Sequence, residues 1–468
     1  MHSFFKAAAL TFAISISFFA SSCIEVDKTL GADNTPDDQA LYLQTATFHL
    51  PLQTKMMDSL QALTTAYGVA GAIRTPEFGL AKFSFATNYA PYYTDKKINL
   101  GTDRKIKSIY LTIQKKSNTV MDLSQTSLPQ NFRVYRMTRV VDTTSRYGEL
   151  KSTDYNPVQI DTGAVIYTGG DTLRVWLKNS FGQELLSATQ LELDSSMRFM
   201  ERFKAMLFMC DAPEDGTYGG RLNVFSTVDA YINILFSFQP TWKSGLARKD
   251  SIFVIPLGDN SYTQNFSSYE SKPLESAEEK EYLTVEGIGG LKPYVDPMVL
   301  KDTLDKWIAK KGYNPKKVLI GKATFRLPFV TDNSTVSFIN NCFPANLYPN
   351  NKIWDTKSSF WYYAPLEDVY TNQNNTGDIN RSLSCYTGDI SSLIQQLVIN
   401  DKDYVQANWK KFAMWFSCVN ENTTSSYYSE TSTTNYTADA SSYYIGKLNG
   451  PLHANYPTIE IIYAVMND

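Results

Sequence analysis

Short runs of β-branched and aromatic residues recur along the chain and constrain its fold more than any other feature. Several alternate between apolar and polar residues, as half-buried strands do. The chain has 468 residues, more than one ordinary domain of about 100–200 residues. We therefore expect a mainly β protein of two tandem antiparallel β-sandwich domains with a few short helices. The predicted strands cover residues 106–113, 132–137, 172–177, 230–238, 251–256, 318–329, 411–418 and 458–465.

The two halves of the chain share a sequence pattern. Ala205-Met206-x-Phe208-x-Cys210 recurs as Ala413-Met414-x-Phe416-x-Cys418, and an aromatic residue and a lysine precede each copy. Each half also opens with a strand pattern and closes with an alternating one, in the same order. This order indicates a duplicated β-sandwich unit. The alternative is convergence of two common strand patterns.

The first residues have the features of a bacterial lipoprotein signal. Lys6 precedes an apolar run from Ala7 to Ala20, which is too short to span a bilayer comfortably. The ending Ala20-Ser21-Ser22-Cys23 predicts cleavage before Cys23 and its attachment to lipid. The alternative is ordinary cleavage near Ala20. Three acyl chains would hold the mature protein stably on a membrane.

Composition shifts set the expected domain boundaries. The segment 24–38 is polar and rich in aspartate, which suits a tether, and residues 262–281 are polar and charged, which suits a linker. The expected divisions are a signal peptide at 1–22, a tether at 23–40, a first sandwich at 41–262, a linker at 263–281 and a second sandwich at 282–468.

Two helices are expected in the second half. Asp296 and Pro297 form a helix start, and Gly312 lies where the helix should end. Asp389–Leu397 has a second apolar stripe. The Ser/Thr/Asn/Tyr-rich segment from Asn420 to Ser442 is predicted to be a long surface loop.

The cysteine and histidine content excludes the usual zinc sites. There are three histidines in the whole chain and no CxxC pair. We expect no metal centre and no cofactor. Cys210 and Cys418 end apolar runs and are predicted to be core thiols. Cys342 and Cys385 lie in more polar sequence, and an exported protein permits a disulfide between them.

Clustered aromatic residues are the candidate ligand-binding positions. Rings with hydroxyl or N–H groups suit sugar or protein recognition. Adjacent residues of a strand point to opposite faces, so about half of each cluster could face a ligand. Core packing is the alternative for the run Phe360–Tyr363. The tyrosine pairs of the Ser/Thr/Asn/Tyr segment are favoured because that segment is not expected in a core. The candidates are Trp361, Tyr362, Tyr427, Tyr428, Tyr443 and Tyr444.

Five segments of the chain carry a resemblance when they are taken together: the lipoprotein signal, the segment around Gly79, the strand beginning at Lys107, the segment 282–291 and the closing strand PTIEIIY. Together they resemble an uncharacterised lipoprotein family of the Bacteroidota, known as a domain of unknown function. The resemblance implies an outer-membrane lipoprotein and transfers no catalytic residue. The second half is also distantly similar to jelly-roll modules of cell-surface and carbohydrate-binding proteins, although shared fold does not establish sugar binding.

The charge balance and the lack of catalytic motifs set the expected function. Lys and Arg number 44 against 47 Asp and Glu, which gives no basic footprint for nucleic acid. No GxSxG, HExxH or Walker motif occurs. We expect a non-enzymatic, lipid-anchored outer-membrane protein, on the cell surface or the periplasmic face, that serves as a binding or assembly component of the cell envelope, with a glycan or an envelope protein as its partner. The alternatives are a surface polysaccharide hydrolase, whose carboxylates no sequence spacing identifies, and a subunit that polymerises by strand exchange.

Overall fold

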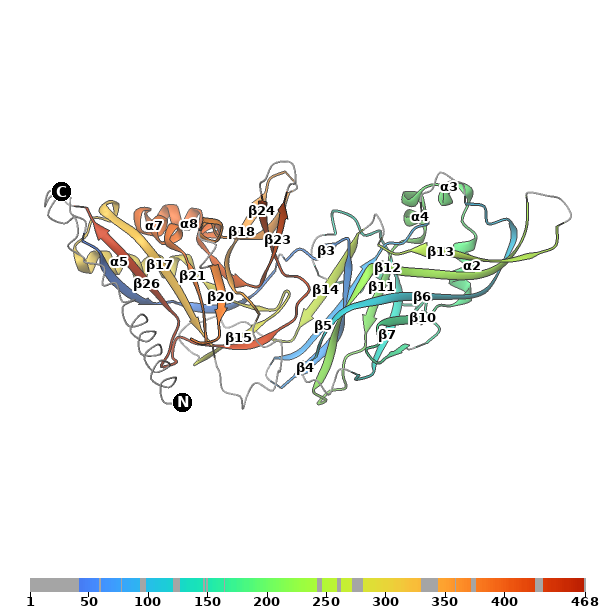
Figure 1. Ribbon diagram of the computed structural model, residues 1–468, viewed down its shortest axis with the longest axis horizontal. Coiled ribbons are helices and arrows are strands. Elements are labelled where there is room, and N and C mark those ends of the chain that lie inside the picture. Colours follow the sequence, from blue (N-terminus) through green and yellow to red (C-terminus); the bar gives the residue numbers. More distant parts are fainter. Residues whose placement is uncertain are drawn as a thin grey trace, which may run out of the picture.

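The chain folds into two β-rich lobes that lie end to end (Figure 1). The computed structural model describes residues 42–466, apart from the segments 59, 77, 93–97, 121–126, 146–147, 149, 164, 242–245, 259–261, 272–280, 330–343, 358, 372–375 and 426–431. Its sheets are antiparallel throughout the described residues, and helices are few and short. The predicted mainly β class with antiparallel sheets is therefore confirmed. No helix among the described residues is both long and apolar enough to cross a bilayer.

The first lobe is one large sheet that curls around its own core. Its two longest strands, β6 and β12, pair along most of their length, and the register between them shifts from Ser226 to Ala230. Phe85, Phe132 and Phe225 fill the space inside the curl. The strands are β3 (Leu63–Thr64), β4 (Tyr67–Thr75), β5 (Gly79–Thr87), β6 (Thr102–Val120), β7 (Gln130–Met137), β8 (Tyr155–Asn156), β9 (Val165–Tyr167), β10 (Thr172–Trp176), β11 (Met206–Cys210), β12 (Gly219–Gln239), β13 (Lys249–Pro256) and β14 (Thr263–Tyr269).

The second lobe is a sandwich of two five-stranded sheets, in the orders β1-β26-β17-β21-β20 and β19-β18-β22-β16-β2. Phe325 from one sheet and Phe416 from the other meet in its core, with ring centroids 4.9 Å apart. The strands are β1 (Gln44–His49), β2 (Leu52–Met56), β16 (Leu291–Val295), β17 (Val318–Pro328), β18 (Tyr348–Asp355), β19 (Phe360–Pro365), β20 (Thr376–Asn380), β21 (Cys385–Asp389), β22 (Met414–Ser417) and β26 (Thr458–Val465). Two further two-stranded sheets are β15 (Tyr282–Glu286) with β25 (Ile445–Asn449) and the hairpin of β23 (Val419–Ser425) with β24 (Ser432–Ala438).

Helices cover the ends and faces of both lobes. The predicted helix after Asp296 is confirmed: the Asp296 carboxylate accepts a hydrogen bond from the Met298 amide at 2.9 Å, and Gly312 ends the helix in the left-handed conformation. The helix predicted at 389–397 is also present, shifted by two residues. The helices are α2 (Asn179–Leu186), α3 (Gln190–Leu193), α4 (Ser196–Phe203), α5 (Pro297–Lys311), η3 (Pro315–Lys317), α6 (Glu367–Thr371), α7 (Ser391–Ile399), α8 (Lys402–Ala407) and α9 (Trp409–Phe412).

The order of elements supports the predicted duplication. In the first lobe β6 pairs with β10 and β12, and α2 follows β10; in the second, β17 pairs with β21 and β26, and α7 follows β21. The strand with the shared motif pairs with β5 and β7 in the first lobe and with β16 and β18 in the second. A short helix leads directly into it in both. Such agreement in pairing and in helix placement goes beyond shared strand composition.

The strand pairing differs from two of the expected boundaries and from one expected loop. The segment 44–56, expected in the first domain, forms β1 and β2 and pairs with β26 and β16 of the second lobe. Residues 263–269, expected in a linker, form β14 and pair along β5. The expected surface loop at 420–442 contains the β23–β24 hairpin. β1, β2 and β14 each pair with a strand far along the chain, which local composition does not report, whereas β23 and β24 pair locally.

Candidate functional site

Strand β18 projects beyond its neighbour in the second lobe and creates a groove. It pairs with β22 only over Tyr348–Asn350, and from there to Asp355 it pairs with β19 alone. The edge left free faces α9, which a hydrogen bond of 3.2 Å from the Asn351 side-chain amide to the Lys411 carbonyl holds in place. The space between them, about 570 Å³, falls in the range of ligand sites. We call it the tryptophan groove; its lining residues are Asn351, Lys352, Ile353, Trp354, Ala407, Asn408, Trp409, Lys410 and Lys411.

Two exposed tryptophans stand on opposite walls of the groove. Trp354, on β18, is 43 % exposed, and Trp409, at the start of α9, is 39 % exposed. Large indole rings normally lose most of their surface to a core, so two exposed rings facing one hollow are informative. Together they offer flat apolar faces with N–H donors at their edges.

The predicted residue Trp361 supports this groove from behind. It lies directly opposite Trp354 in the β18–β19 register, and the two ring centroids are 5.1 Å apart. The Lys410 ammonium lies 3.8 Å from the centroid of the Trp361 ring, a cation–π contact. Trp361 is half-buried and therefore positions Trp354 and Lys410. Tyr362, the next candidate, is half-buried on the opposite face of the hairpin and packs near Phe360.

The groove carries uncompensated positive charge. Lys352 forms an ion pair with Asp58 at 2.7 Å, so its charge is balanced. Lys410 and Lys411 have no carboxylate within ion-pairing distance in the part of the chain that the structure describes. The Asn351 side-chain oxygen, also in the groove wall, accepts no hydrogen bond from the described residues. The groove thus combines apolar ring faces, two available cations and one unsatisfied acceptor.

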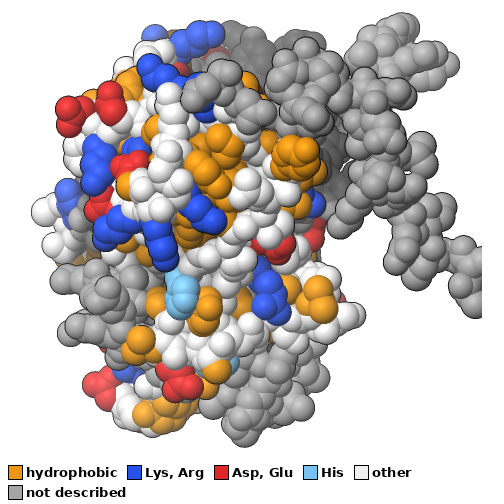
Figure 2. Space-filling model, turned by 90° about the vertical axis from the view of Figure 1, so that its left-hand side faces the viewer, with side chains coloured by type: hydrophobic (Ala, Val, Ile, Leu, Met, Phe, Trp, Pro, Cys, Tyr) orange, Lys and Arg blue, Asp and Glu red, His pale blue; other side chains and the backbone are white. Residues whose placement is uncertain are grey.

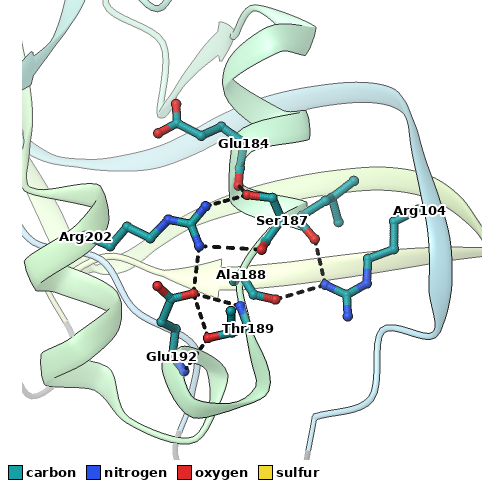
Figure 3. A network of polar contacts seen from close by, with 8 residues as sticks. Arg104, Glu184, Ser187, Ala188, Thr189, Glu192 and Arg202 are labelled. Atoms are coloured by element: carbon teal, nitrogen blue, oxygen red, sulfur yellow. Dashed lines mark hydrogen bonds and ion pairs between the residues drawn. The ribbon is translucent and has the colours of Figure 1, made fainter.

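In the first lobe, the side chain at the position that matches Lys410 is held by internal hydrogen bonds. The shared motif places Arg202, on α4, where Lys410 stands on α9. Arg202 donates to the Glu192 carboxylate at 2.7 Å and to the Ser187 hydroxyl at 2.6 Å, and Glu192 also accepts from Thr189 (Figure 3). The Glu192 carboxylate therefore balances the charge of Arg202 within the first lobe. The first lobe therefore has no counterpart of the groove at this position.

Two of the predicted tyrosine candidates are in the core. Tyr443 and Tyr444 are 3 % and 4 % exposed, which corrects the expectation that their segment lies outside a core. Tyr443 donates to the Glu286 carboxylate at 3.1 Å, and burial raises the pKa of both phenols. Neither ring is open to a ligand. Tyr427 and Tyr428 lie outside the described residues.

The thiols follow the sequence prediction in part. Cys210 is buried and Cys418 half-buried, and burial raises the pKa of each to about 12, so both are unreactive thiols. Cys385 is a buried free thiol. Cys342 lies outside the described residues, so the disulfide with Cys385 stays a prediction. Within the described part of the chain no cluster of His, Cys, Asp and Glu could hold a metal ion.

A second hollow lies where the lobes join. It measures about 330 Å³ and is mostly apolar, with Met57, Leu60 and Phe83 in its walls. Buried residues of both lobes surround it, among them Val69 of β4 and Tyr294 of β16. We call this shared set the interlobe cluster; it fixes one lobe on the other by ordinary hydrophobic packing.

Sequence reasoning missed Trp354, Trp409, Lys410 and Lys411. The sequence WKKF at 409–412 did carry a signal, because two lysines inside a run of aromatic residues contradict a simple core pattern. The sequence around Trp354 carried no such signal, because the exposure of this side chain depends on where β22 stops pairing with β18. No protein-family model matches the chain, and a search of curated proteins finds no similar sequence.

Proposed function

We propose that this protein is a lipid-anchored, non-enzymatic outer-membrane protein that binds an acidic polysaccharide in the tryptophan groove. The observation that carries the proposal is the pairing of two exposed indoles, Trp354 and Trp409, with the available ammonium groups of Lys410 and Lys411. Ring faces attract the C–H groups of a sugar through their negative quadrupole, and ammonium groups attract carboxylates or sulfates. A neutral glycan would leave the lysines without a role.

Affinity electrophoresis tests the ligand. The protein is run through gels that contain polygalacturonate or, as the neutral comparison, dextran. We expect polygalacturonate to slow the protein, and the paired substitution Trp354→Ala with Trp409→Ala to weaken binding by roughly tenfold or more, since each ring contributes on the order of 1 kcal/mol. High salt should weaken it further.

The first lobe offers a matched control. Trp176 on β10 is 49 % exposed and lies beside a shallow hollow with Lys107 and Lys178. Trp176→Ala removes an equally exposed indole, and we expect the binding to persist. Equal retardation of wild type and the double variant would contradict the proposal, as would loss of binding in Trp176→Ala alone.

Attachment to lipid needs its own test. Metabolic labelling with a fatty acid should mark the wild-type chain and leave Cys23→Ser unlabelled. Protease added to intact cells of the native host then distinguishes the two faces of the outer membrane, with a periplasmic lipoprotein as the control. Unlabelled wild-type protein would contradict the anchor without bearing on the groove.

A hydrolase is the second candidate, and one contact favours it. The Tyr348 hydroxyl hydrogen-bonds both Glu421 and Asp378, the latter at 3.3 Å, and the rings of Tyr370 and Tyr436 lie beside it. Two carboxylates on one hydroxyl lie close to the separation of about 5 Å that retaining glycosidases use. Both side chains are exposed, whereas the acid of such a pair is usually buried. Release of reducing ends from polygalacturonate that Glu421→Gln abolishes would establish this activity.

Polymerisation by strand exchange is the third candidate. β1 is an edge strand near the start of the described residues, and within the described part of the chain it pairs with β26 alone. A second copy could supply the same strand. Sedimentation of the purified protein over a range of concentrations would reveal it as a growing oligomer.

A further inference from the structure

One end of the second lobe gathers lysines. Helix α5 and the short helix η3 place Lys310, Lys311 and Lys316 there, all three exposed. Figure 2 looks onto this end of the molecule and shows Lys and Arg side chains gathered beside apolar ones. The end lies opposite the first lobe along the long axis (Figure 1).

Exposed apolar side chains share this end with the lysines. Tyr42 and Leu43, directly before β1, are 71 % and 72 % exposed. Leu319 and Met466 are also exposed, and they lie at the adjoining ends of β17 and β26. Two contacts join these segments: the Met466 amide donates to the Lys317 carbonyl at 2.9 Å, and the Tyr313 hydroxyl donates to Gln44 at 3.2 Å.

Nearby carboxylates of the described residues do not balance the positive charge of these three lysines. The carboxylates of α5 are already engaged, Asp302 by Lys402 and Asp305 by Lys301. For Lys310, Lys311 and Lys316 the described part of the chain provides no carboxylate at ion-pairing distance. Exposed lysines beside exposed aromatic and aliphatic side chains are the combination that binds an anionic membrane surface.

We propose that this end, which we call the membrane face, rests on a bilayer that contains anionic phospholipids. The proposal rests on the proposed lipid anchor, because the chain runs from Cys23 through 20 residues to β1, and β1 begins at this end. A tether of that length can reach about 70 Å, so acyl chains alone do not orient the body. Docking of the membrane face would orient the body, and it would direct the first lobe away from the bilayer.

Vesicle sedimentation tests the membrane face apart from the anchor. The non-acylated chain 24–468 retains every described residue. It is mixed with vesicles of phosphatidylcholine alone or of phosphatidylcholine and phosphatidylglycerol in equal parts. We expect it to sediment with the anionic vesicles and to dissociate as salt is raised. Lysines near an anionic surface act roughly additively, so Lys310→Gln, Lys311→Gln and Lys316→Gln together should weaken binding about a hundredfold.

Two further variants make the result specific. Lys105→Gln, Lys116→Gln and Lys151→Gln together remove three exposed lysines of the first lobe, and we expect this control to bind as the wild type does. Tyr42→Ser with Leu43→Ser should weaken binding about tenfold, because these two apolar side chains would no longer insert into the membrane surface. Thermal unfolding of each variant verifies that it is folded.

Three results would overturn the membrane face. They are equal sedimentation with both kinds of vesicle, undiminished binding by the α5–η3 variant, and an equal loss in the first-lobe control. Fatty-acid labelling of Cys23 is measured on separate material. If the chain is labelled but does not bind anionic vesicles, the membrane face is refuted and the lipid anchor is supported. If the chain is unlabelled but binds the vesicles, the anchor is refuted and the membrane face is supported.

Discussion

The two lobes place matching residues in opposite environments. Arg202 of the first lobe belongs to a closed network with Glu192 and Ser187, whereas Lys410, at the matching position of the second, lies over Trp361 beside open solvent. One residue earlier, Glu201 in the first lobe matches Trp409 in the second. The cores around both motifs are alike, with a phenylalanine buried in each. The two lobes therefore keep similar cores around the motif and differ in what a single helix turn exposes.

The edges of the matching sheets differ as well. In the first lobe β13, which follows β12 directly, pairs with the outer side of β12. In the second lobe the outer side of β26 pairs with β1, from the other end of the described chain. The first lobe closes its sheet with a local strand and the second with a distant one. The second lobe is accordingly more sensitive to the state of the N-terminal segment.

The largest expected effect compares the matching core rings. Phe208 stacks on Phe85 at 4.6 Å between centroids, and Phe416 packs on Phe325 at 4.9 Å. Truncating either ring to alanine should cost about 3–5 kcal/mol of unfolding free energy. Because the interlobe cluster joins the lobes, calorimetry should show one transition that both substitutions lower.

A matched pair of milder changes serves as the control. Phe208→Leu and Phe416→Leu retain most of the volume and should each cost less than about 2 kcal/mol. Two separate calorimetric transitions, each responding to only one alanine variant, would show that the lobes unfold independently in spite of their shared cluster.

The second prediction compares the buried cations. Arg221 in the first lobe and Lys292 in the second are both almost fully buried. Burial lowers the pKa of Lys292 to about 7, while an arginine keeps its proton at any ordinary pH. Above pH 7 the unfolded chain binds a proton at Lys292 that the folded chain releases. Stability should therefore rise with pH through this side chain, from about 7 towards its ordinary value near 10.5.

Chemical denaturation at pH 7 and pH 8.5 measures this rise, which one proton limits to about 2 kcal/mol. Lys292→Met should remove it, and Arg221→Met should leave the pH dependence as it is. Burial raises the pKa of the neighbouring Glu286, which gives a slope of the opposite sign above its ordinary value near 4.5. A wild-type slope that survives in Lys292→Met would assign the effect to other groups.

The third prediction concerns matching helix starts. The Thr189 hydroxyl caps α3, and the Asp401 carboxylate caps α8 by accepting from the Tyr404 amide at 2.8 Å. Each substitution to alanine should cost about 1 kcal/mol. Asp401→Thr should be nearly neutral, whereas Thr189→Asp should cost as much as the alanine variant or more, because it places a second carboxylate beside Glu192, which accepts from the Thr189 hydroxyl. Equal effects of the two exchanges would show that the two starts are equivalent.

The smallest expected effect compares Arg202 of the first lobe with Lys410 of the second. Arg202→Ala breaks two charge-assisted contacts and should lower the unfolding free energy by about 1 kcal/mol. Lys410→Ala removes a half-buried group whose contact is with the Trp361 ring, and it should change stability by only about 0.5 kcal/mol. Urea titrations of the two variants side by side decide this. A costlier Lys410→Ala would give Lys410 a structural role and weaken its assignment to the groove.

Local patterns predicted much of the fold. The alternating run that became β26 and the start at Asp296 were readable because the residues that define them are neighbours in sequence. The three helices of the first lobe were missed, since helices of four to eight residues leave little periodicity. The place of β1 in the second lobe depends on a partner far along the chain, which no local pattern records.

The candidate site was predictable only through Trp361. That residue stood out in an aromatic run, and the structure places it against Trp354 and Lys410. Tyr443 and Tyr444 were misassigned because a polar neighbourhood in sequence does not prevent burial when a segment crosses the joint between lobes. Exposure depends on where strands stop pairing, and composition does not report that.

The pairing of β1 with β26 also has a consequence for the order of assembly. Gln44 lies opposite Tyr463, so almost the whole chain separates the two strands. Contacts of such long sequence separation form slowly, and this one waits until the last strand has been synthesised. The segment beside the predicted lipid attachment would then be the first part of the body to emerge and the last to acquire its neighbour. Truncation after β25 would leave β1 without a partner and would expose the edge of β17 that β26 covers, although β17 would still pair with β21. Such open edges favour aggregation.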